Sequence, residues 1–139
     1  MTELRQQPRR SVAEVMTSPP IMIQADASVT DAAEILWSEG IGAVLVGGPD
    51  DVLGVLSERD VVALLAHGGN PDLTLVREAM TSPVIQLDVT DTVLDAAIQA
   101  VDIGVRHLPV MDGGVVGGVV SIRDLVLPAS GSSAGRAVR

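Results

Sequence analysis

Apolar and polar residues alternate along this chain in a pattern that predicts a short strand followed by an amphipathic helix. Residues 21–23 are all apolar, as expected of a short buried strand. Ser28 is suited to cap the next helix, with Asp31 at the capping-box position, and Gly40 is suited to end it. The apolar residues on one face of this helix are Val29, Ala32, Ala33, Leu36 and Trp37. We expect this face, Trp37 included, to pack in a core; the alternative for Trp37 is an anchor in a dimer interface.

Two further strands and a second helix complete the pattern. Residues 43–46 and 52–56 are rich in apolar side chains, and the GGPDD segment between them favours a tight reversal. The second helix begins at Ser57 and runs to about Ala66, where HGGNP ends it. A short helical turn ending in Met-Thr-Ser-Pro precedes the strand at 21–23, because proline stops helices and favours an extended residue before it. The predicted order of elements is β-α-β-β-α.

The same pattern returns 64 residues later, so that residues 12–62 align with 76–126 without a gap. VAEVMTSP returns as VREAMTSP, and GVLSERDVV returns as GVVSIRDLV. Such self-similarity indicates two copies of one structural unit. The elements predicted for the second copy are a strand at 85–87, a helix between Thr92 and Gly104, strands at 107–111 and 115–120, and a helix beginning at Ser121.

The fold class that follows is mixed α/β (α+β), with tandem β-α-β-β-α repeats packed with pseudo-twofold symmetry around a cleft. Neither copy alone would bury both faces of its sheet. The predicted parts are a flexible N-terminal tail at 1–10, repeat 1 at 11–66, a linker at 67–74, repeat 2 at 75–128 and a flexible C-terminal tail at 129–139.

The charges of the chain bear on its partners. It has 139 residues, a formal net charge of −9, no cysteine and no lysine. Between residues 11 and 128, 17 acidic residues stand against four arginines, a balance of −13 that repels a phosphate polymer. With one tryptophan and no Phe or Tyr, the chain offers no aromatic platform for single strands. Nucleic-acid binding is therefore not expected, except through the arginines of the two tails.

The sequence carries no signal of an enzyme, a metal site or a membrane protein. Cysteine is absent, the two histidines stand in unrelated contexts, and no metal-binding motif or phosphate loop occurs. No apolar run approaches the roughly 20 residues that span a bilayer, and no apolar segment of a secretory signal follows the N-terminal arginines. We expect a cytoplasmic, non-catalytic protein that requires no metal or cofactor.

The repeated motifs resemble those of CBS domains. They are MTSP before a short strand, VTDAA at the start of the first helix, GVRHLPVMD, and the Gly-Val-Val-Ser-x-Arg-Asp stretch, in order over residues 11–128. The chain is similar to a stand-alone tandem pair, or Bateman module, of the kind common in actinobacteria. The resemblance implies a regulatory module that binds AMP, ADP or ATP, or else NAD(H) or S-adenosylmethionine, in the cleft between its repeats. It also implies a homodimer and a regulated partner protein.

The resemblance further implies a role for several residues of these motifs. The aspartate of each Ser-x-x-Asp motif would contact ribose and its serine phosphate, the basic pair of GVRHLPVMD would reach phosphate, and the backbone of each first strand would face adenine. The arginine inside each Ser-x-x-Asp motif and the threonine of each MTSP segment are further candidates. The candidate ligand-binding residues are Thr17, Ile23, Ser57, Arg59, Asp60, Thr81, Leu87, Arg106, His107, Ser121, Arg123 and Asp124.

The chemistry of these side chains suits the roles and leaves alternatives open. One ionised carboxylate can accept hydrogen bonds from both ribose hydroxyls, and a helix N-terminus favours a bound phosphate. Ser-x-x-Asp is also a capping box, which by itself would explain both copies. The two threonines are at least as well suited to hydrogen bonds within their turns. The arginines of the Ser-x-x-Asp motifs and His107 also suit solvent-facing or structural positions.

The two copies differ at one pair of positions. The second copy has Arg106 and His107 where the first has glycine and alanine at 42–43. In paired modules a pocket often combines the aspartate of one repeat with the basic residues of the other. The resemblance therefore favours Asp60 with Arg106 and His107 as the stronger site, and Asp124 is the second candidate. The missing basic residues in the first copy also leave a ligand-free dimeric adaptor as the alternative function.

Overall fold

Two copies of the same pattern of strands and helices form the fold in the computed structural model, which describes residues 10–82 and 84–126. The strands are β1 (Met22–Ile23), β2 (Ala43–Gly48), β3 (Asp51–Ser57), β4 (Leu87–Asp88), β5 (His107–Asp112) and β6 (Val115–Ser121). The helices are α2 (Val29–Glu39), α3 (Glu58–Ala66), α4 (Val76–Ala79), α5 (Val93–Ile103) and α6 (Ile122–Val126), and a short 3-10 helix spans Val12–Glu14. The tails predicted at 1–10 and 129–139 lie outside the described residues, apart from Arg10.

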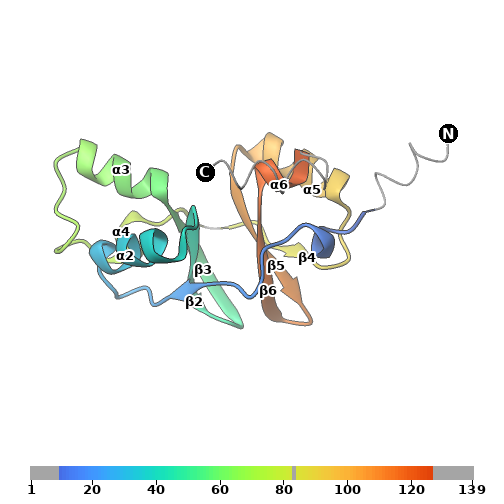
Figure 1. Ribbon diagram of the computed structural model, residues 1–139, viewed down its shortest axis with the longest axis horizontal. Helices are drawn as coiled ribbons and strands as arrows, with labels where there is room; N and C mark the ends of the chain where they lie inside the picture. The colour runs from blue at the N-terminus through green and yellow to red at the C-terminus, as the bar shows by residue number, and fades with distance from the viewer. Residues whose placement is uncertain (1–9, 83, 127–139) are drawn as a thin grey trace. The chain divides into compact units, whose positions relative to one another are not determined.

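Each copy builds a three-stranded sheet of the same topology (Figure 1). The first strand runs parallel to the second, and the second runs antiparallel to the third, giving the orders β1-β2-β3 and β4-β5-β6. The predicted mixed α/β fold of two repeated units is therefore confirmed. The first strand of each copy is shorter than predicted, and β4 begins at Leu87, two residues later than expected.

Helices α2 and α5 begin and end where the sequence predicts. Ser28 Oγ accepts from the Asp31 backbone N–H at 3.0 Å, and Thr92 Oγ1 accepts in the same way at the start of α5. Gly40 and Gly104, which end the two helices, have φ angles of 66° and 82°. A side chain would be strained in this left-handed conformation, so glycine is the residue suited to both ends.

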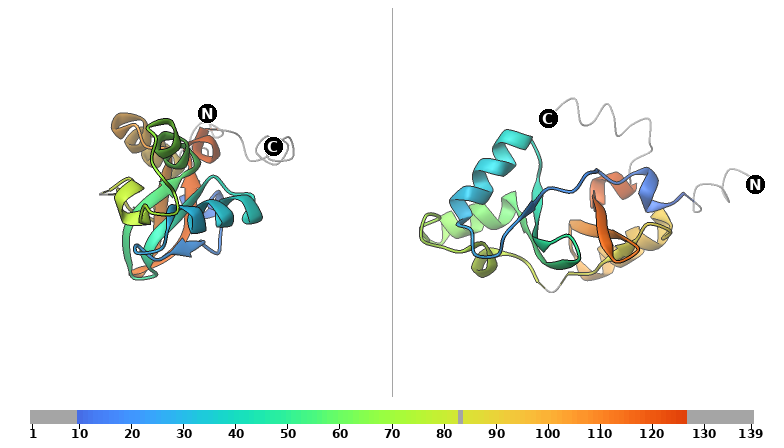
Figure 2. Two further views of the ribbon diagram at one scale, coloured as in Figure 1. Left: turned by 90° about the vertical axis from the view of Figure 1, so that its left-hand side faces the viewer. Right: turned by 90° about the horizontal axis from the view of Figure 1, so that it is seen from below.

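The core of the first copy lies where α2 and α3 pack against each other and against the β2–β3 hairpin (Figure 2). The buried side chains of this cluster are Ile23, Ala32, Leu36, Val44, Val46, Leu56 and Val76. Val76 is fully buried, yet it comes from α4, beyond the linker predicted at 67–74. The first sheet therefore depends on a segment that the sequence pattern assigns to the second repeat.

The chain divides into two compact units that are not two successive lengths of sequence. Pro20–Ile85 form a continuous unit, and, of the described residues, 10–19 join 86–126 in a split unit. The backbone of Thr81 pairs with Val55 of β3, and the backbone of Thr17 pairs with Val119 of β6. The MTSP segment that opens each repeat in the sequence thus extends the sheet of the other copy.

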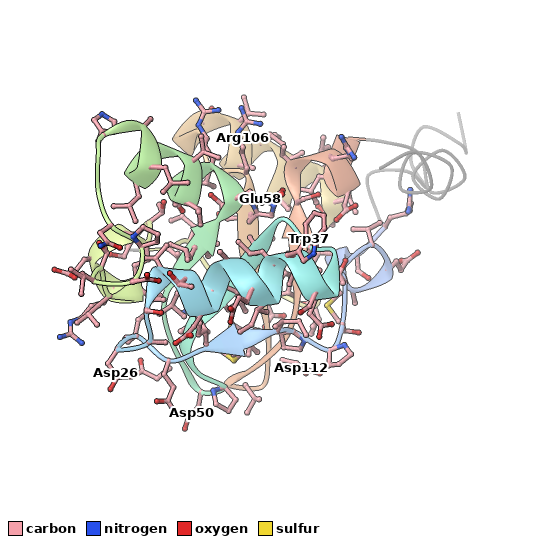
Figure 3. The ribbon with its side chains drawn as sticks, turned by 60° about the vertical axis from the view of Figure 1, so that its left-hand side comes forward. Asp26, Trp37, Asp50, Glu58, Arg106 and Asp112 are labelled. Atoms are coloured by element: carbon pink, nitrogen blue, oxygen red, sulfur yellow. The ribbon has the colours of Figure 1, made fainter. Side chains whose placement is uncertain are left out.

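The prediction that Trp37 packs in the core is wrong. Its side chain is 89% exposed, and Val101, at the matching position of α5, is 63% exposed. The buried residues of α2 are Val29, Ala32 and Leu36. Successive residues of a helix are about 100° apart, so Trp37 lies one step around the helix from Leu36 and leaves the buried face. Figure 3 shows Trp37 near the C-terminal end of α2.

We expect a fragment of residues 20–85 to be better folded than a fragment of residues 11–66, the predicted limits of repeat 1. The second fragment lacks Val76, whose full burial contributes roughly 1.5–3 kcal/mol, and it lacks Thr81, which extends the sheet at β3. Circular dichroism and urea titration of both purified fragments measure the difference. Equal stability of the two would mean that the first sheet does not need the segment after the linker.

Candidate functional site

The Ser-x-x-Asp motif of the first copy lies where β3 passes into α3. Ser57 is the N-cap of α3, and Asp60 is the third residue of the helix. The Asp60 backbone N–H donates to Ser57 Oγ at 3.2 Å, and the Ser57 backbone N–H donates to the Asp60 carboxylate at 2.9 Å. These reciprocal hydrogen bonds form a capping box, so the capping interpretation of this motif is confirmed.

The donor proton of the Ser57 hydroxyl is engaged in this capping box. The hydroxyl donates its one proton to Asp60 Oδ2 at 3.0 Å, and its oxygen accepts the Asp60 backbone N–H. A hydroxyl has a single proton to donate, so Ser57 can reach a phosphate oxygen as a donor after it rotates away from Asp60. In the arrangement seen here Ser57 orients the carboxylate.

Thr81 reaches the same carboxylate from the segment after α4. Its Oγ1 donates to Asp60 Oδ1 at 3.4 Å, a long hydrogen bond. Its backbone is held on β3, since the Thr81 N–H donates to the Val55 carbonyl at 2.9 Å and the Thr81 carbonyl accepts the Val55 N–H at 3.1 Å. Ser57, Asp60 and Thr81 together are called the first corner below, and all three belong to the continuous unit.

Oδ1 is the atom through which Asp60 can accept a hydrogen bond from a ligand. A carboxylate offers about four acceptor positions on its two oxygens. Oδ2 already accepts twice from Ser57, whereas Oδ1 accepts once, over the longer distance, from Thr81. Asp60 is half-buried, and a hydrogen bond to an ionised group is stronger than one between neutral groups. The first corner can therefore cap its helix and accept a hydroxyl donor at the same time.

The second copy forms the matching corner where β6 passes into α6. The Ser121 N–H donates to Asp124 Oδ2 and the Asp124 N–H donates to Ser121 Oγ, each at 3.2 Å. His107 lies directly opposite Ser121 in the β5–β6 ladder, and the Arg106 carbonyl accepts the Ile122 N–H at 2.8 Å. The strand register thus brings Arg106 and His107 to the end of the sheet where Ser121 and Asp124, the second corner, lie.

The two corners differ in charge. At the second corner Arg106 and Arg123 are exposed and His107 is half-buried. At the first corner Arg59 is exposed, and Ala43 takes the ladder position that His107 has in the second copy. An anion near the second corner therefore meets more positive charge. The predicted combination of Arg106 and His107 with Asp60 joins residues of different units and stays a prediction.

The remaining candidate residues are placed as follows. Thr17 is exposed, and its backbone pairs with Val119, so it belongs with β6 although the sequence places it in the first repeat. Ile23 and Leu87 are buried in β1 and β4, where Ile23 pairs with Val46 of β2. Their side chains serve the cores, so what these two residues offer a ligand is backbone, as the resemblance implies.

The sequence analysis missed four residues that build the two corners, namely Met16, Gly54, Met80 and Gly118. Each glycine lies directly beneath an MTSP segment, with a methionine sulfur close to the place that a Cβ would take. A signal was present, because this methionine and this glycine both recur at the 64-residue offset.

Several acidic side chains of the continuous unit are exposed, among them Asp26 and Asp50. Figure 3 shows Asp26 and Asp50 pointing outward from its loops. Within residues 10–82 and 84–126, no group of three or more histidine, aspartate or glutamate side chains is placed to hold a metal ion. No helix in this part of the chain combines the length and apolar character needed to cross a membrane.

Comparison with known proteins matches both repeats to one family. The family model described as the CBS domain covers residues 12–67 and 76–128. An uncharacterized protein of Methanopyrus kandleri is 33% identical over 119 residues, which are 84% of this chain and 61% of that protein. The chain therefore spans less than two thirds of the length of this curated relative.

Solved structures of similar proteins share the fold. A CBS-domain containing protein from Agrobacterium tumefaciens is 30% identical, with a TM-score of 0.75 over 84% of this chain and 96% of that one. A CBS domain protein from Pyrobaculum aerophilum, complexed with AMP, is 25% identical, with a TM-score of 0.77 over 93% of this chain and 99% of that one.

We expect Ser57→Ala to lower the free energy of unfolding by about 1 kcal/mol, because it removes an N-cap hydrogen bond. Ser28→Ala is the matched control, since Ser28 caps α2 in the same way at 3.0 Å. Urea denaturation of both variants measures the losses. A loss at Ser28 without one at Ser57 would show that the motif of the first corner does not serve as a cap.

Proposed function

The chain belongs to the CBS domain family through both of its repeats, and from this premise we propose that it is a regulatory module without catalytic activity of its own. It binds an adenosine-containing ligand, with AMP, ADP and ATP as the first candidates, and the bound ligand modulates a partner protein. The observation that carries this proposal is the first corner, where Asp60 keeps acceptor capacity on Oδ1 while Oδ2 is held by Ser57.

An adenosine ligand fits this acceptor because ribose presents two adjacent hydroxyl donors. Asp60 accepts from one or both of them through Oδ1 and keeps its capping bonds through Oδ2. The similar Pyrobaculum aerophilum protein is complexed with AMP, which supports this ligand class. We assign ribose to Asp60 first and phosphate to Arg106 and His107, and Asp124 is the competing ribose acceptor.

We expect Asp60→Asn to lower the affinity for the ligand by about tenfold to a hundredfold, because it replaces an ionised acceptor by a neutral amide of the same shape. Isothermal calorimetry with AMP, ADP, ATP, NADH and S-adenosylmethionine measures binding to the wild-type chain and to the variant. Asp124→Asn is the matched control at the equivalent position of the second copy.

The outcomes of this experiment decide which corner binds ribose and whether the chain binds a nucleotide at all. A loss with Asp124→Asn and none with Asp60→Asn would move the ribose to the second corner. No binding of any of the five compounds at millimolar concentration would contradict the ligand proposal. A nucleotide-free dimer that binds a partner protein would then favour the adaptor function.

We also propose that the chain is a homodimer with Trp37 at the interface. Trp37 is 89% exposed, and Val62 of α3 in the same unit is 62% exposed. Contiguous exposed apolar patches mark interaction surfaces, and tryptophan is enriched among the residues that dominate binding, so Trp37 is the first candidate for an anchor. With core packing excluded for Trp37, its alternative role as an interface anchor is the better supported one.

We expect Trp37→Ala to weaken dimerisation by about thirtyfold or more and to leave the fold intact, because Trp37 buries almost nothing within its own chain. Val115→Ala is the control, since Val115 is a 49% exposed apolar side chain of the split unit. Sedimentation equilibrium measures association, and circular dichroism checks the fold. A wild-type monomer at micromolar concentration would overturn the dimer, and an unchanged Trp37→Ala dimer would overturn the anchor.

A further inference from the structure

The MTSP segment of the second repeat lies against β3 at a distance that only glycine permits. A Cβ on Gly54 would come within 2.6 Å of Met80 Sδ and 2.8 Å of the Thr81 carbonyl oxygen. Folded proteins essentially never contain Cβ contacts this short. A methionine side chain can rotate away, but the Thr81 carbonyl is backbone, and the backbone of Thr81 is held by two hydrogen bonds with Val55, one through its carbonyl and one through its N–H. A side chain at position 54 would therefore displace Thr81.

The second copy repeats this close approach. A Cβ on Gly118 would come within 2.7 Å of both Met16 Sδ and the Thr17 carbonyl oxygen. Thr17 and Val119 exchange two backbone hydrogen bonds, at 2.8 and 3.0 Å. Gly48 and Gly117 of the sheets lack this constraint, since the nearest atoms to an added Cβ are 3.8 and 3.5 Å away. A Cβ on Gly47 would clash with the Asp51 carbonyl oxygen, but that contact lies within the β2–β3 hairpin itself. Gly54 and Gly118 are thus the two sheet glycines at which the close neighbour is an MTSP segment.

The position of Thr81 matters because its hydroxyl meets the one carboxylate oxygen of Asp60 with spare acceptor capacity. Thr81 Oγ1 donates to Oδ1, whereas both bonds from Ser57 go to Oδ2. The Thr81 hydroxyl can also accept a hydrogen bond while it donates to Asp60. A ligand hydroxyl at this place would therefore find two neighbouring acceptors, Asp60 Oδ1 and Thr81 Oγ1.

We propose that Gly54 is a positioning residue of the ligand site, which acts by seating Met80 and Thr81 on β3 so that the Thr81 hydroxyl stands beside Asp60 Oδ1. The part of this proposal that concerns ligand binding rests on the proposed function. The part that concerns the seating of Thr81 does not. The first corner is thus completed by Thr81, which the sequence pattern assigns to the second repeat. Gly54 contributes by leaving room for Thr81, since glycine has no side chain of its own.

The test compares Gly54→Ala with Gly118→Ala and with Gly48→Ala, where the added Cβ has room. Amide hydrogen exchange of Thr81 reports its seating, and calorimetry with AMP reports the site. We expect Gly54→Ala to speed the exchange of the Thr81 amide by about tenfold or more while the Thr17 amide keeps its protection. Gly118→Ala has the opposite pattern, and Gly48→Ala changes neither amide. AMP affinity falls about tenfold with Gly54→Ala.

A double variant separates positioning from general damage. If Gly54 acts through the Thr81 hydroxyl, Thr81→Val lowers AMP affinity in the wild-type chain but adds little to Gly54→Ala. Additive losses would show that Gly54 acts by another route and would overturn the positioning role. Thr81→Val keeps the backbone bonds, so it also tests the hydroxyl in a folded chain if Gly54→Ala fails to fold.

The hydrogen-exchange result and the AMP-affinity result test separate parts of the proposal. An unchanged Thr81 amide in Gly54→Ala overturns the seating of Thr81, whatever AMP does. A wild-type chain that does not bind AMP contradicts the proposed nucleotide and the ligand part of this proposal, and the exchange data then decide the seating alone.

Discussion

The fold depends on two pairs of backbone hydrogen bonds, one between Thr81 and Val55 and one between Thr17 and Val119. Each pair attaches an MTSP segment to the third strand of a sheet, above a glycine that leaves room for it. The attachment at Thr81 follows α4, which carries Val76 into the core of the continuous unit. It also places the Thr81 hydroxyl beside Asp60. One short backbone contact thus connects the packing of the core with the chemistry of the candidate site.

Much of the fold could be predicted from the sequence because the signals are local. Ser28 and Gly40 mark the ends of α2 through cap geometry, and both matched the structure. Which sheet each MTSP segment joins could not be predicted. The segments are nearly identical in the two copies, so their sequences fit either sheet equally well. The error at Trp37 has a different cause, because an apolar face drawn from periodicity is wider than the face that neighbouring elements cover.

The sequence could predict which types of residue form the candidate site. It predicted less well which of these residues lie together in space. The Ser-x-x-Asp motif indicated both a cap and a ligand contact, and Asp60 can combine the two because its oxygens have different partners. The grouping of Thr81 with Asp60 depends on a contact between residues 21 positions apart, which no local pattern reports. The position of His107 opposite Ser121 follows from the register of β5 against β6, which is fixed by the pairing of the whole ladder.

The exchange of segments has a mechanical consequence. Arg10, where the description of the chain begins, and Val126, where it ends, both belong to the split unit. The Arg10 carbonyl accepts the Val93 N–H, and Thr17 is bonded to Val119, so residues 10–17 are anchored within that unit. A pulling force applied at the two ends would be carried by these anchors. The continuous unit is inserted in the sequence between residues 19 and 86, so tension along the chain would reach it after these anchors had opened.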